Sequence, residues 1–384
     1  MMSTIVVKPV ENREEYFAAR ELAAHIFSRG NLPDEAARMD RANRYLSLPG
    51  FAFDWHRIAL KGDQVAAHVV ALPLRLRYGS VELRVGGLGA VCTDPAWRKQ
   101  GLAAAVLQDA IHYMQARGDH ISLLDGIPGF YHQFGYHTVW PGSSLEFSAE
   151  AAAALDAPLQ SRPASIADAQ AMGDLYDRCW GHRVAIVRSH ALWHWRLETM
   201  PLPSMRVIED RTGCMVGYYV GADEVLEVVA ETEAAALTAI AEIGRAYLAH
   251  NRETVSLVVP PDDRLVFTAR RWLTTTLHTR YVPNGHWMGR IVDPVGLRDI
   301  MLPEMMQRAG LDGRGLIFDI QPDAVHIGLR GQDSTNVQIE PGDFLRLMFG
   351  TLPASQLDFH ADATHLLERL FPPRTAMIAP WDWF

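Results

Sequence analysis

The strongest chemical signal in the sequence lies between a predicted strand and a predicted helix. This segment reads Val91-Cys92-Thr93-Asp94-Pro95-Ala96-Trp97-Arg98-Lys99-Gln100-Gly101-Leu102-Ala103. The first N–H groups of a helix have no partner inside the helix, and they lie at the positive end of its dipole. Gly101 lets an anion approach the backbone closely, and Arg98 and Lys99 add positive charge. The segment therefore predicts a binding site for a phosphate or pyrophosphate group, although an ordinary strand-to-helix turn shares part of this pattern.

Two further interpretations of the segment differ in strength. A dinucleotide-binding site is the weaker one, because Gly86, Gly87 and Gly89 lie before the strand ends and no G-x-G-x-x-G opens the helix. The strand edge at Val91–Thr93, in contrast, is free to pair with an extended ligand that carries amide groups. The sequence thus favours an anionic ligand with an amide-bearing arm.

The elements around this segment predict a mixed α/β layer. Apolar residues recur at helical spacing over 12–28, and Asp34 is a suitable N-cap for a second helix that ends near Leu46. Turn residues at Gly62 and Gly79 separate apolar runs that predict four strands, over 51–60, 64–74, 74–78 and 81–93. A helix over 100–117, a strand over 121–124, a helical turn over 130–134 and a strand from residue 136 are expected next.

Two motifs on this scaffold resemble the GNAT-type N-acetyltransferases. The core Arg98-x-x-Gly101-x-Ala103 is similar to the acetyl-CoA signature R/Q-x-x-G-x-G/A of that family. Downstream, Phe130-Tyr131-His132-Gln133-Phe134-Gly135-Tyr136 is similar to the family's F-Y-x-x-x-G-F/Y segment. The resemblance implies acetyl-CoA as co-substrate, and it carries over to the cofactor-binding positions Val91, Cys92, Thr93, Arg98, Lys99, Gln100, Gly101, Leu102, Ala103, Ala104, Gly126 and Ile127. The first three would pair with the pantetheine arm, the loop amides would hold the pyrophosphate, and the last two would flank the thioester.

Over its whole length the chain resembles the enhanced intracellular survival (Eis) group. That resemblance implies an α/β (α+β mixed) fold with two tandem GNAT-like domains and a sterol-carrier-protein-like α/β domain. The expected division is a catalytic GNAT domain over 1–150, a GNAT-like domain without the cofactor signature over 151–284, and the sterol-carrier-like domain over 285–384. The Ala-rich stretch Ala149–Pro163 is interpreted as a linker. Beyond it we expect helices over 165–179, 189–198, 233–251, 295–309, 344–349 and 364–370, and strands over 205–209, 215–219, 225–229, 255–259, 287–292, 316–320, 324–329 and 337–339.

Acetyl transfer to an amine needs a base for the amine proton, a proton donor for the departing thiolate and N–H groups for the oxyanion. The resemblance assigns the donor to Tyr131 and the base to the carboxylate of the last residue, Phe384. A free α-carboxylate has a pKa of about 3.3–3.7, and burial beneath Trp381 and Trp383 would raise it. The alternatives are a core tyrosine with a satisfied hydroxyl and an aromatic tail that only packs.

Charge restricts the class of partner. The chain has 384 residues with 36 Lys and Arg against 45 Asp and Glu, a net charge of −9. Nucleic acid is not expected as the main partner, because phosphate contacts need clustered basic residues. The balance leaves room for a cationic amine steered to an acidic cleft. Candidates for its lining are Asp34, Glu35, Asp40 and Asp54, whose plainer interpretation is solvated helix charge.

The acceptor is expected to be a small-molecule amine, with a polyamine or an aminoglycoside as examples, since known members of the group acetylate several amines of one aminoglycoside. One alternative is acetylation of protein or peptide lysines. Another is a non-catalytic protein that binds acyl-CoA or lipid. The group's tendency to form hexamers implies a homo-oligomer.

Cysteine and histidine usage predicts neither a disulfide framework nor a metal site. Cys92, Cys179 and Cys214 are odd in number and form no CxxC, which favours a reducing cytoplasm. His190 and His194 have the spacing of a zinc-protease helix, but Ala191 stands where its glutamate would be. With no apolar run of about 20 residues and no signal peptide visible, a cytoplasmic protein without a membrane span is expected.

Overall fold

A computed structural model describes residues 5–28, 30–199, 205–221, 224–310 and 315–382. Its largest sheet runs in the order β1 (Ile5–Pro9), β2 (His56–Lys61), β3 (Gln64–Tyr78), β4 (Val81–Thr93), β5 (Ile121–Gly126), β15 (His286–Ile291) and β6 (His137–Thr138). At a side branch, β9 (Val184–Ile186) pairs with β3, and β19 (Ala376–Met377) pairs with β9. The mixed α/β class expected from the sequence is confirmed.

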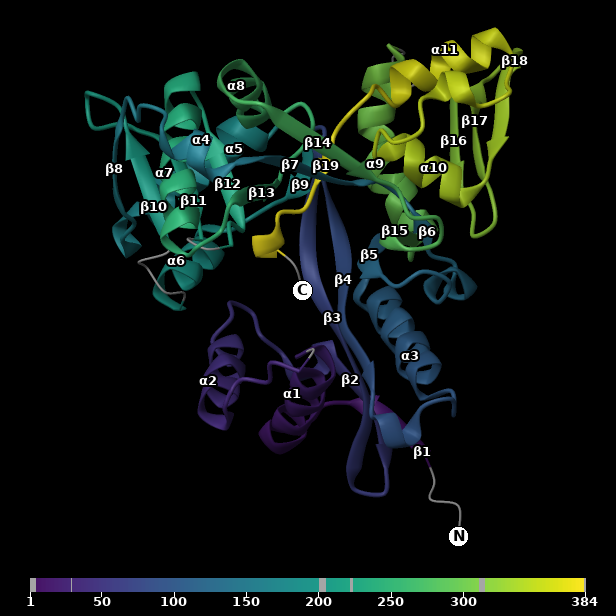
Figure 1. Ribbon diagram of the computed structural model, residues 1–384. Helices are drawn as coiled ribbons and strands as arrows, with labels where there is room; N and C mark the ends of the chain where they lie inside the picture. The colour runs from purple at the N-terminus through teal and green to yellow at the C-terminus, as the bar shows by residue number, and fades with distance from the viewer. Residues whose placement is uncertain (1–4, 29, 200–204, 222–223, 311–314, 383–384) are drawn as a thin grey trace.

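Helices cover the two faces of this sheet from opposite sides. The helices α1 (Arg13–Phe27) and α2 (Glu35–Leu46) lie on one side of the β3–β4 column and α3 (Leu102–Arg117) lies on the other (Figure 1). Successive strand residues point to opposite faces. In β3, accordingly, Val69 and Ala71 pack in the core with α3, whereas Val70 and Leu72 face α1. The sheet therefore separates the α3 side of the molecule from the α1–α2 side.

Two smaller sheets follow in the middle of the chain. One has the order β12 (Glu227–Ala230), β11 (Met215–Val220), β10 (Met205–Glu209), β8 (Gln160–Pro163), and the other β13 (Thr254–Val258), β7 (Gly142–Ser148), β14 (Thr275–Arg280). Their helices are α4 (Ala149–Ala153), α5 (Ala169–Trp180), α6 (His190–Thr199), α7 (Glu233–Ala249) and α8 (Arg264–Trp272).

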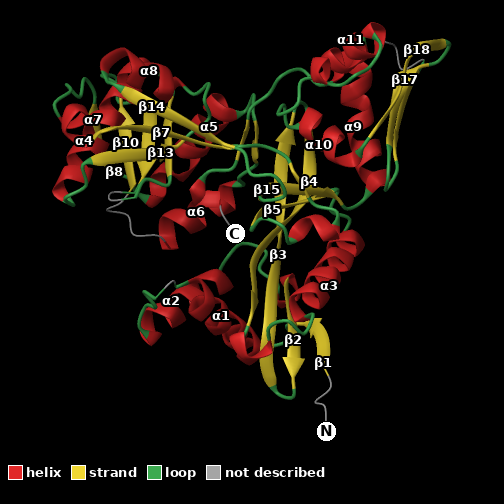
Figure 2. Cartoon of the chain, turned by 45° about the vertical axis from the view of Figure 1, so that its right-hand side comes forward, coloured by secondary structure: helices red, strands yellow, loops and turns green. Residues whose placement is uncertain are grey.

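The remaining part carries the sheet β16 (Leu316–Ile320), β17 (Val325–Leu329), β18 (Gln332–Ile339). It also carries α9 (Pro294–Ala309), α10 (Pro341–Met348) and α11 (Ala361–Leu370), which lie to one side of that sheet (Figure 2). Strand pairing crosses the expected boundaries, because β7 pairs with β13 and β14, and β15 pairs with β5. Among the described helices, none combines the length and the hydrophobicity that crossing a bilayer requires.

The linker interpretation of Ala149–Pro163 is wrong. This stretch forms α4 and β8, and α4 packs closely on α7. A Cβ on Gly244 of α7 would lie only 2.7 Å from the Cβ of Ala152, so the alanines are small because two helices touch there. The side chain of Ser148 caps α4 by accepting a hydrogen bond from the N–H of Ala151.

Two expectations for the first sheet also need correction. The expected strands over 64–74 and 74–78 are one strand, β3. Pro73 is tolerated inside it because pairing with β2 ends at Val70 and pairing with β9 starts at Leu76, so the missing N–H faces no partner. The order of elements also begins with a strand that was missed, the short edge strand β1, whose Ile5 and Val6 are exposed.

Candidate active site

The central feature of the site is the point where β4 and β5 stop pairing. The two parallel strands pair only from Val85 to Gly87 on β4, opposite Ile121 to Leu123 on β5. Beyond Gly87, β4 continues to Thr93 with β3 as its described neighbour. The rest of β5 pairs with β15, which is its partner over the whole of Ile121–Gly126. The register of β4 also shifts at Ala90, whose φ is 51°. The predicted segment Val91–Thr93 therefore offers backbone amides on the β5 side that no described strand uses.

The helix that follows begins without a side-chain cap. Gly101 is the N-cap of α3 with φ 80°, and no side chain accepts from the first turn. The helices α1, α2 and α7 are capped by side chains of Asn12, Asp34 and Thr232. A Cβ added at Gly101 would meet no atom within 4 Å, so the space in front of this turn is open. The N–H groups of the predicted phosphate loop are thus available to an anion.

The loop between β4 and α3 also holds two buried polar atoms that lack partners. Thr93 Oγ1 and Trp97 Nε1 are buried and make no hydrogen bond to any described residue. Lys61 braces the loop, with its Nζ 4.4 Å from the centre of the Trp97 ring and donating to Gln100 Oε1 at 2.9 Å. Unpaired buried polar groups are costly unless a ligand or water satisfies them. The loop consequently fits a polar ligand such as the phosphate-bearing part of an acyl-CoA.

The other predicted cofactor positions differ in accessibility. Arg98 and Lys99 are exposed, and Arg98 Nε donates to the Thr93 carbonyl at 3.4 Å. Cys92 is buried, and burial raises the pKa of its thiol to about 12, so it is no nucleophile. Gly126 is buried at the end of β5, whereas Ile127 is exposed.

Tyr131 lies against the end of β5. It opens the 3-10 helix η3 (Tyr131–Phe134) and is only 7% exposed. Its ring lies so close to Gly126 that a Cβ there would be 2.7 Å from Tyr131 Cδ2. Phe130 and Tyr136 pack edge-on against the same ring, at centroid distances of 5.0 and 6.2 Å. The structure thus brings together Tyr131 and Gly126, two positions that the resemblance assigns to the site.

Two neighbouring tyrosines differ in what their hydroxyls do. Tyr136 Oη donates to Ser122 Oγ at 2.7 Å, whereas no described residue hydrogen-bonds to the Tyr131 hydroxyl. Burial, and to a smaller extent the charge of Asp125, raises the pKa of Tyr131 to about 12. Tyr131 therefore carries its proton at neutral pH and has a free bonding position.

The C-terminal tail is fixed beside α6. Trp381 packs edge-on against Trp193 at a centroid distance of 5.4 Å. The Asp382 carboxylate accepts from Arg188 Nε at 3.0 Å and from Arg196 Nη2 at 2.7 Å. Arg188 also donates from Nη1 to Glu227 Oε1 at 2.7 Å. These four charged side chains, Arg188, Arg196, Glu227 and Asp382, are called the tail anchor below.

The predicted base, Phe384, lies outside the described residues, as does Trp383. Asp382 is not a substitute for it. Burial raises the pKa of Asp382, but the charges of Arg188 and Arg196 outweigh burial and lower that pKa below its usual value. A carboxylate held ionised by two arginines is a poor proton acceptor, so Asp382 anchors the tail.

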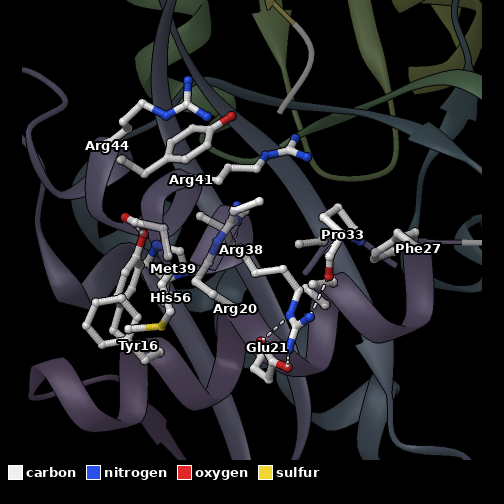
Figure 3. Close-up of a pocket in the computed structure, with 18 of the residues that line it drawn as sticks. Tyr16, Arg20, Glu21, Phe27, Pro33, Arg38, Met39, Arg41, Arg44 and His56 are labelled. Carbon is white, nitrogen blue, oxygen red and sulfur yellow. Dashed lines mark hydrogen bonds and ion pairs between the residues drawn. The ribbon is translucent and has the colours of Figure 1, made fainter. Parts of the chain in front are cut away.

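A cavity of about 750 Å³ lies between α1, α2 and the sheet (Figure 3). Its charged lining residues are Arg20, Glu21, Arg38, Arg41 and Arg44. Ala90 also lines it, so this arginine pocket adjoins the irregular part of β4. The helix that holds the tail also touches its wall, because Arg44 Nη1 donates to the Thr199 carbonyl of α6 at 3.0 Å.

The expectation of an acidic cleft is wrong for the arginine pocket. None of the four candidate carboxylates, Asp34, Glu35, Asp40 and Asp54, lines it. Asp34 instead caps α2, accepting from the N–H of Ala37 at 2.8 Å. The basic lining was missed, although Arg38, Arg41 and Arg44 recur at intervals of three and so share one helix face. Among the described residues no cluster of three or more histidines, cysteines or acids could hold a metal ion.

Comparison with known proteins agrees with this geometry. Residues 11–139 match the family model described as an acetyltransferase (GNAT) domain. That segment contains the β4 edge, the α3 loop and Tyr131. This part of the chain is therefore similar to the GNAT class of acetyltransferase domains.

Solved structures extend the similarity over nearly the whole chain. A GCN5-related N-acetyltransferase from Anabaena variabilis has a TM-score of 0.66 at 15% identity, covering 97% of this chain and 98% of that chain. One from Kribbella flavida has a TM-score of 0.66 at 17% identity, covering 97% and 98%. Eis1 from Mycobacterium abscessus has a TM-score of 0.60 at 14% identity, covering 98% and 99%. At these identities the likeness shows a shared fold. No curated protein sequence matches the chain.

Proposed function

We propose that this protein is an acetyl-CoA-dependent N-acetyltransferase that acts on a small-molecule amine. The observation that carries the proposal is the unpaired edge of β4 leading into the uncapped start of α3. The edge supplies amides for an extended pantetheine arm. The helix start supplies N–H donors for a pyrophosphate, and Gly101 keeps the approach open.

The reaction joins the amine nitrogen to the acetyl carbon. The nitrogen attacks the thioester carbonyl, the C–N bond forms and the C–S bond breaks. One proton leaves the nitrogen for a base, and one proton reaches the departing sulfur, so the products are an acetamide and free CoA thiol. Tyr131 acts as the donor to the sulfur, supported by its raised pKa and its free hydroxyl. The terminal carboxylate of Phe384 acts as the base, supported by the anchoring of residues 381 and 382 beside the arginine pocket.

Substitution of Gly101 tests the cofactor site directly. Gly101→Glu places a negative side chain where the pyrophosphate would lie, and we expect CoA affinity measured by calorimetry to fall by at least about tenfold. Gly213→Glu is the matched control, because Gly213 has φ 83° and open space in front of it, in the turn between β10 and β11. Unchanged CoA affinity in folded Gly101→Glu would contradict the proposed site.

The same proposal keeps three parts, a catalytic part over 1–150, a second GNAT-like part over 151–284 and a sterol-carrier-like part over 285–384. The full-length likeness to GNAT structures supports it. Pairing of β7 and β15 with strands of other parts joins the three parts, so each is proposed as a structural unit within one chain.

The alternative acceptor is a lysine side chain of a protein or peptide. Release of CoA thiol from acetyl-CoA in the presence of lysine peptides tests it.

A further inference from the structure

The arginine pocket lies on the opposite face of the sheet from the proposed cofactor loop. Val70 and Leu72 of β3 line it, and their neighbours Val69 and Ala71 pack with α3 on the other face. Ala90 connects the two, because it lines the pocket and belongs to the β4 segment beside the unpaired edge. The pocket is therefore placed to hold a second substrate, with one end near the thioester, and its arginines are separate from the pyrophosphate loop.

The charges that line this pocket do not cancel. Four arginines line it together with one carboxylate, Glu21. Arg38 pairs with that carboxylate by donating to Glu21 from Nε at 2.9 Å and from Nη2 at 2.6 Å. Figure 3 shows these two bonds as dashed lines. Among the described carboxylates, Arg44 pairs with Asp40, an exposed residue outside the lining, at 3.3 Å.

Arg20 and Arg41 have no carboxylate of their own. Within the described part of the chain, no carboxylate oxygen lies within 4.0 Å of either guanidinium. Arg20 is half-buried and is held over the Tyr45 ring at 4.9 Å, and Arg41 is an exposed lining residue. His56 adds no charge, since burial, and then the charge of Arg20, lowers its pKa to about 3. Two guanidinium groups thus line the cavity without a counter-ion among the described residues.

The rest of the wall is apolar and aromatic. Phe17, Phe51 and Trp55 line the pocket, together with Phe27 and Met39 near its exposed edge. A ligand that uses the whole site therefore has an apolar body as well as an anion. The volume of about 750 Å³ lies in the range of small-molecule pockets.

We propose that the acceptor of this enzyme is a small amine that carries a carboxylate or phosphate group on an apolar body, and that Arg20 and Arg41 bind the anionic group. The proposal rests on the acyl-transfer function proposed above. The guanidinium fork matches both carboxylate and phosphate oxygens. A polycationic acceptor would meet uncompensated positive charge in this pocket, so the structure disfavours the polyamines and aminoglycosides that the sequence suggested.

Matched pairs of amines test this preference. The probes are 4-(aminomethyl)benzoate against benzylamine, phosphoethanolamine against ethanolamine, and spermidine as the polycation. Binding is measured by calorimetry without acetyl-CoA, and turnover by thiol release with it. We expect the anionic member of at least one pair to bind, and to be acetylated with kcat/KM, about 10- to 100-fold better than its neutral partner. The two pairs distinguish carboxylate from phosphate recognition.

Substitutions then connect the preference to named residues. Arg20→Gln and Arg41→Gln should each raise KM for the preferred anionic amine about tenfold or more, with little change for its neutral partner. Arg20→Lys keeps a charge and should recover part of the affinity. Arg270→Gln is the control, because Arg270 is exposed on α8 and lies outside the pocket lining.

The two readouts separate this inference from the acyl-transfer proposal. Selective binding of the anionic probes with no thiol release from any acceptor would support the pocket assignment and contradict the proposed reaction. Stronger binding of spermidine, no binding of any anionic probe, or glutamine variants that behave as the parent would overturn the pocket assignment.

Discussion

Two groups of arginines in the molecule differ in how their charge is balanced. In the tail anchor, Arg188 and Arg196 face Glu227 and Asp382, and all four side chains are buried. In the arginine pocket, four arginines share the one lining carboxylate of Glu21. Burial of unpaired charge is costly, so a fold that keeps a surplus of guanidinium groups keeps it where solvent or a ligand can reach.

The difference in charge balance suits the tail anchor to a structural role and the arginine pocket to the proposed binding role. The tail anchor joins residues that are 194 positions apart, Arg188 and Asp382, and fixes the end of the chain. The Tyr218 hydroxyl donates to Glu227 at 2.6 Å, and the Arg188 guanidinium lies 4.1 Å from the centre of the Tyr176 ring, so Arg188 has no free side. The arginine pocket leaves Arg20 and Arg41 free for a ligand. The same residue type thus forms balanced buried pairs in one place and, in our proposal, recognises a ligand in the other.

The largest effect is expected from Tyr131→Phe, which tests whether the arginine pocket and the tail anchor serve a reaction that uses Tyr131. Loss of the hydroxyl removes the proposed donor and should lower kcat about 10²- to 10⁴-fold while the protein stays folded. Because burial raises the pKa of Tyr131 to about 12, the donor form persists up to that pH, and its deprotonation should give no alkaline limb below about pH 10. Steady-state kinetics across pH check both statements.

Tyr136→Phe is the control for that variant. It removes a hydroxyl that already donates to Ser122, so a modest loss of stability with nearly normal kcat is expected. If both variants kept normal kcat, Tyr131 would be a packing residue.

Next in size is Asp382→Asn, which unbalances the tail anchor. The change leaves Arg188 and Arg196 with one buried carboxylate, and loss of one partner of a buried pair costs about 3–5 kcal/mol. Because the charges of these arginines lower the folded pKa of Asp382, its contribution to stability is present at neutral pH. That contribution is lost as pH falls from the unfolded pKa of about 3.9 through the lower folded value. Urea unfolding at several pH values measures this.

Asp177→Asn is the exposed counterpart. Asp177 accepts from Arg77 at 2.9 Å at the surface, where such a pair contributes about 0.2–1 kcal/mol. Equal losses of unfolding free energy in Asp382→Asn and Asp177→Asn would mean that the tail anchor contributes no more stability than a surface ion pair.

A one-residue extension at the C-terminus tests what the anchor is for. An added Gly moves the terminal carboxylate by about 3.3–3.6 Å, and a misplacement of about 1 Å already costs about 10²-fold in rate. We expect kcat to fall by that order, and we expect the acidic limb of the pH–rate profile to disappear. Phe384→Leu keeps the carboxylate and should be only impaired. Normal rate and an intact acidic limb in the extended protein would leave the tail a packing role.

The sequence signals for the proposed cofactor side of the site are local. The anion-binding loop, Gly101 and Tyr131 lie in continuous motifs, and the helix over 100–117 differs from α3 only by its first residues. The linker at Ala149–Pro163 was predicted wrongly because an alanine-rich stretch with two prolines has few large apolar side chains that would mark a buried helix. Its small residues make sense only once α7 is known to pack against them. The strands β9 and β14 and the helix α8 were missed. β9 is only three residues long, and it forms a strand because it pairs with the distant β3.

The charge of the proposed acceptor pocket could not be predicted from composition. A net charge of −9 is an average over the chain, and it conceals a pocket whose charged lining residues are four arginines and one glutamate. Arg20 comes from α1, whereas Arg38, Arg41 and Arg44 come from α2, so the surplus exists only when the two helices pack together. The tail anchor depends in the same way on contacts between distant parts of the chain.

The smallest effect comes from Glu21→Gln, which makes in the pocket the same carboxylate-to-amide change as Asp382→Asn makes in the anchor. Arg38 holds the pKa of Glu21 below its usual value through a two-bond ion pair, but both side chains are partly exposed, so the loss of stability should be small. Removal of the one lining carboxylate frees Arg38 and should lower KM for an anionic amine about two- to fivefold, because solvent screens the attraction between charges near the surface. The effect should fade in 1 M salt, where the screening length falls to about 3 Å. Glu15→Gln is the control, because Glu15 of α1 pairs with Lys8 of β1 and lies outside the pocket lining. A raised KM for the anionic amine in Glu21→Gln, with Glu15→Gln unchanged, would show that Glu21 positions Arg38 for the ligand and does not compete with it.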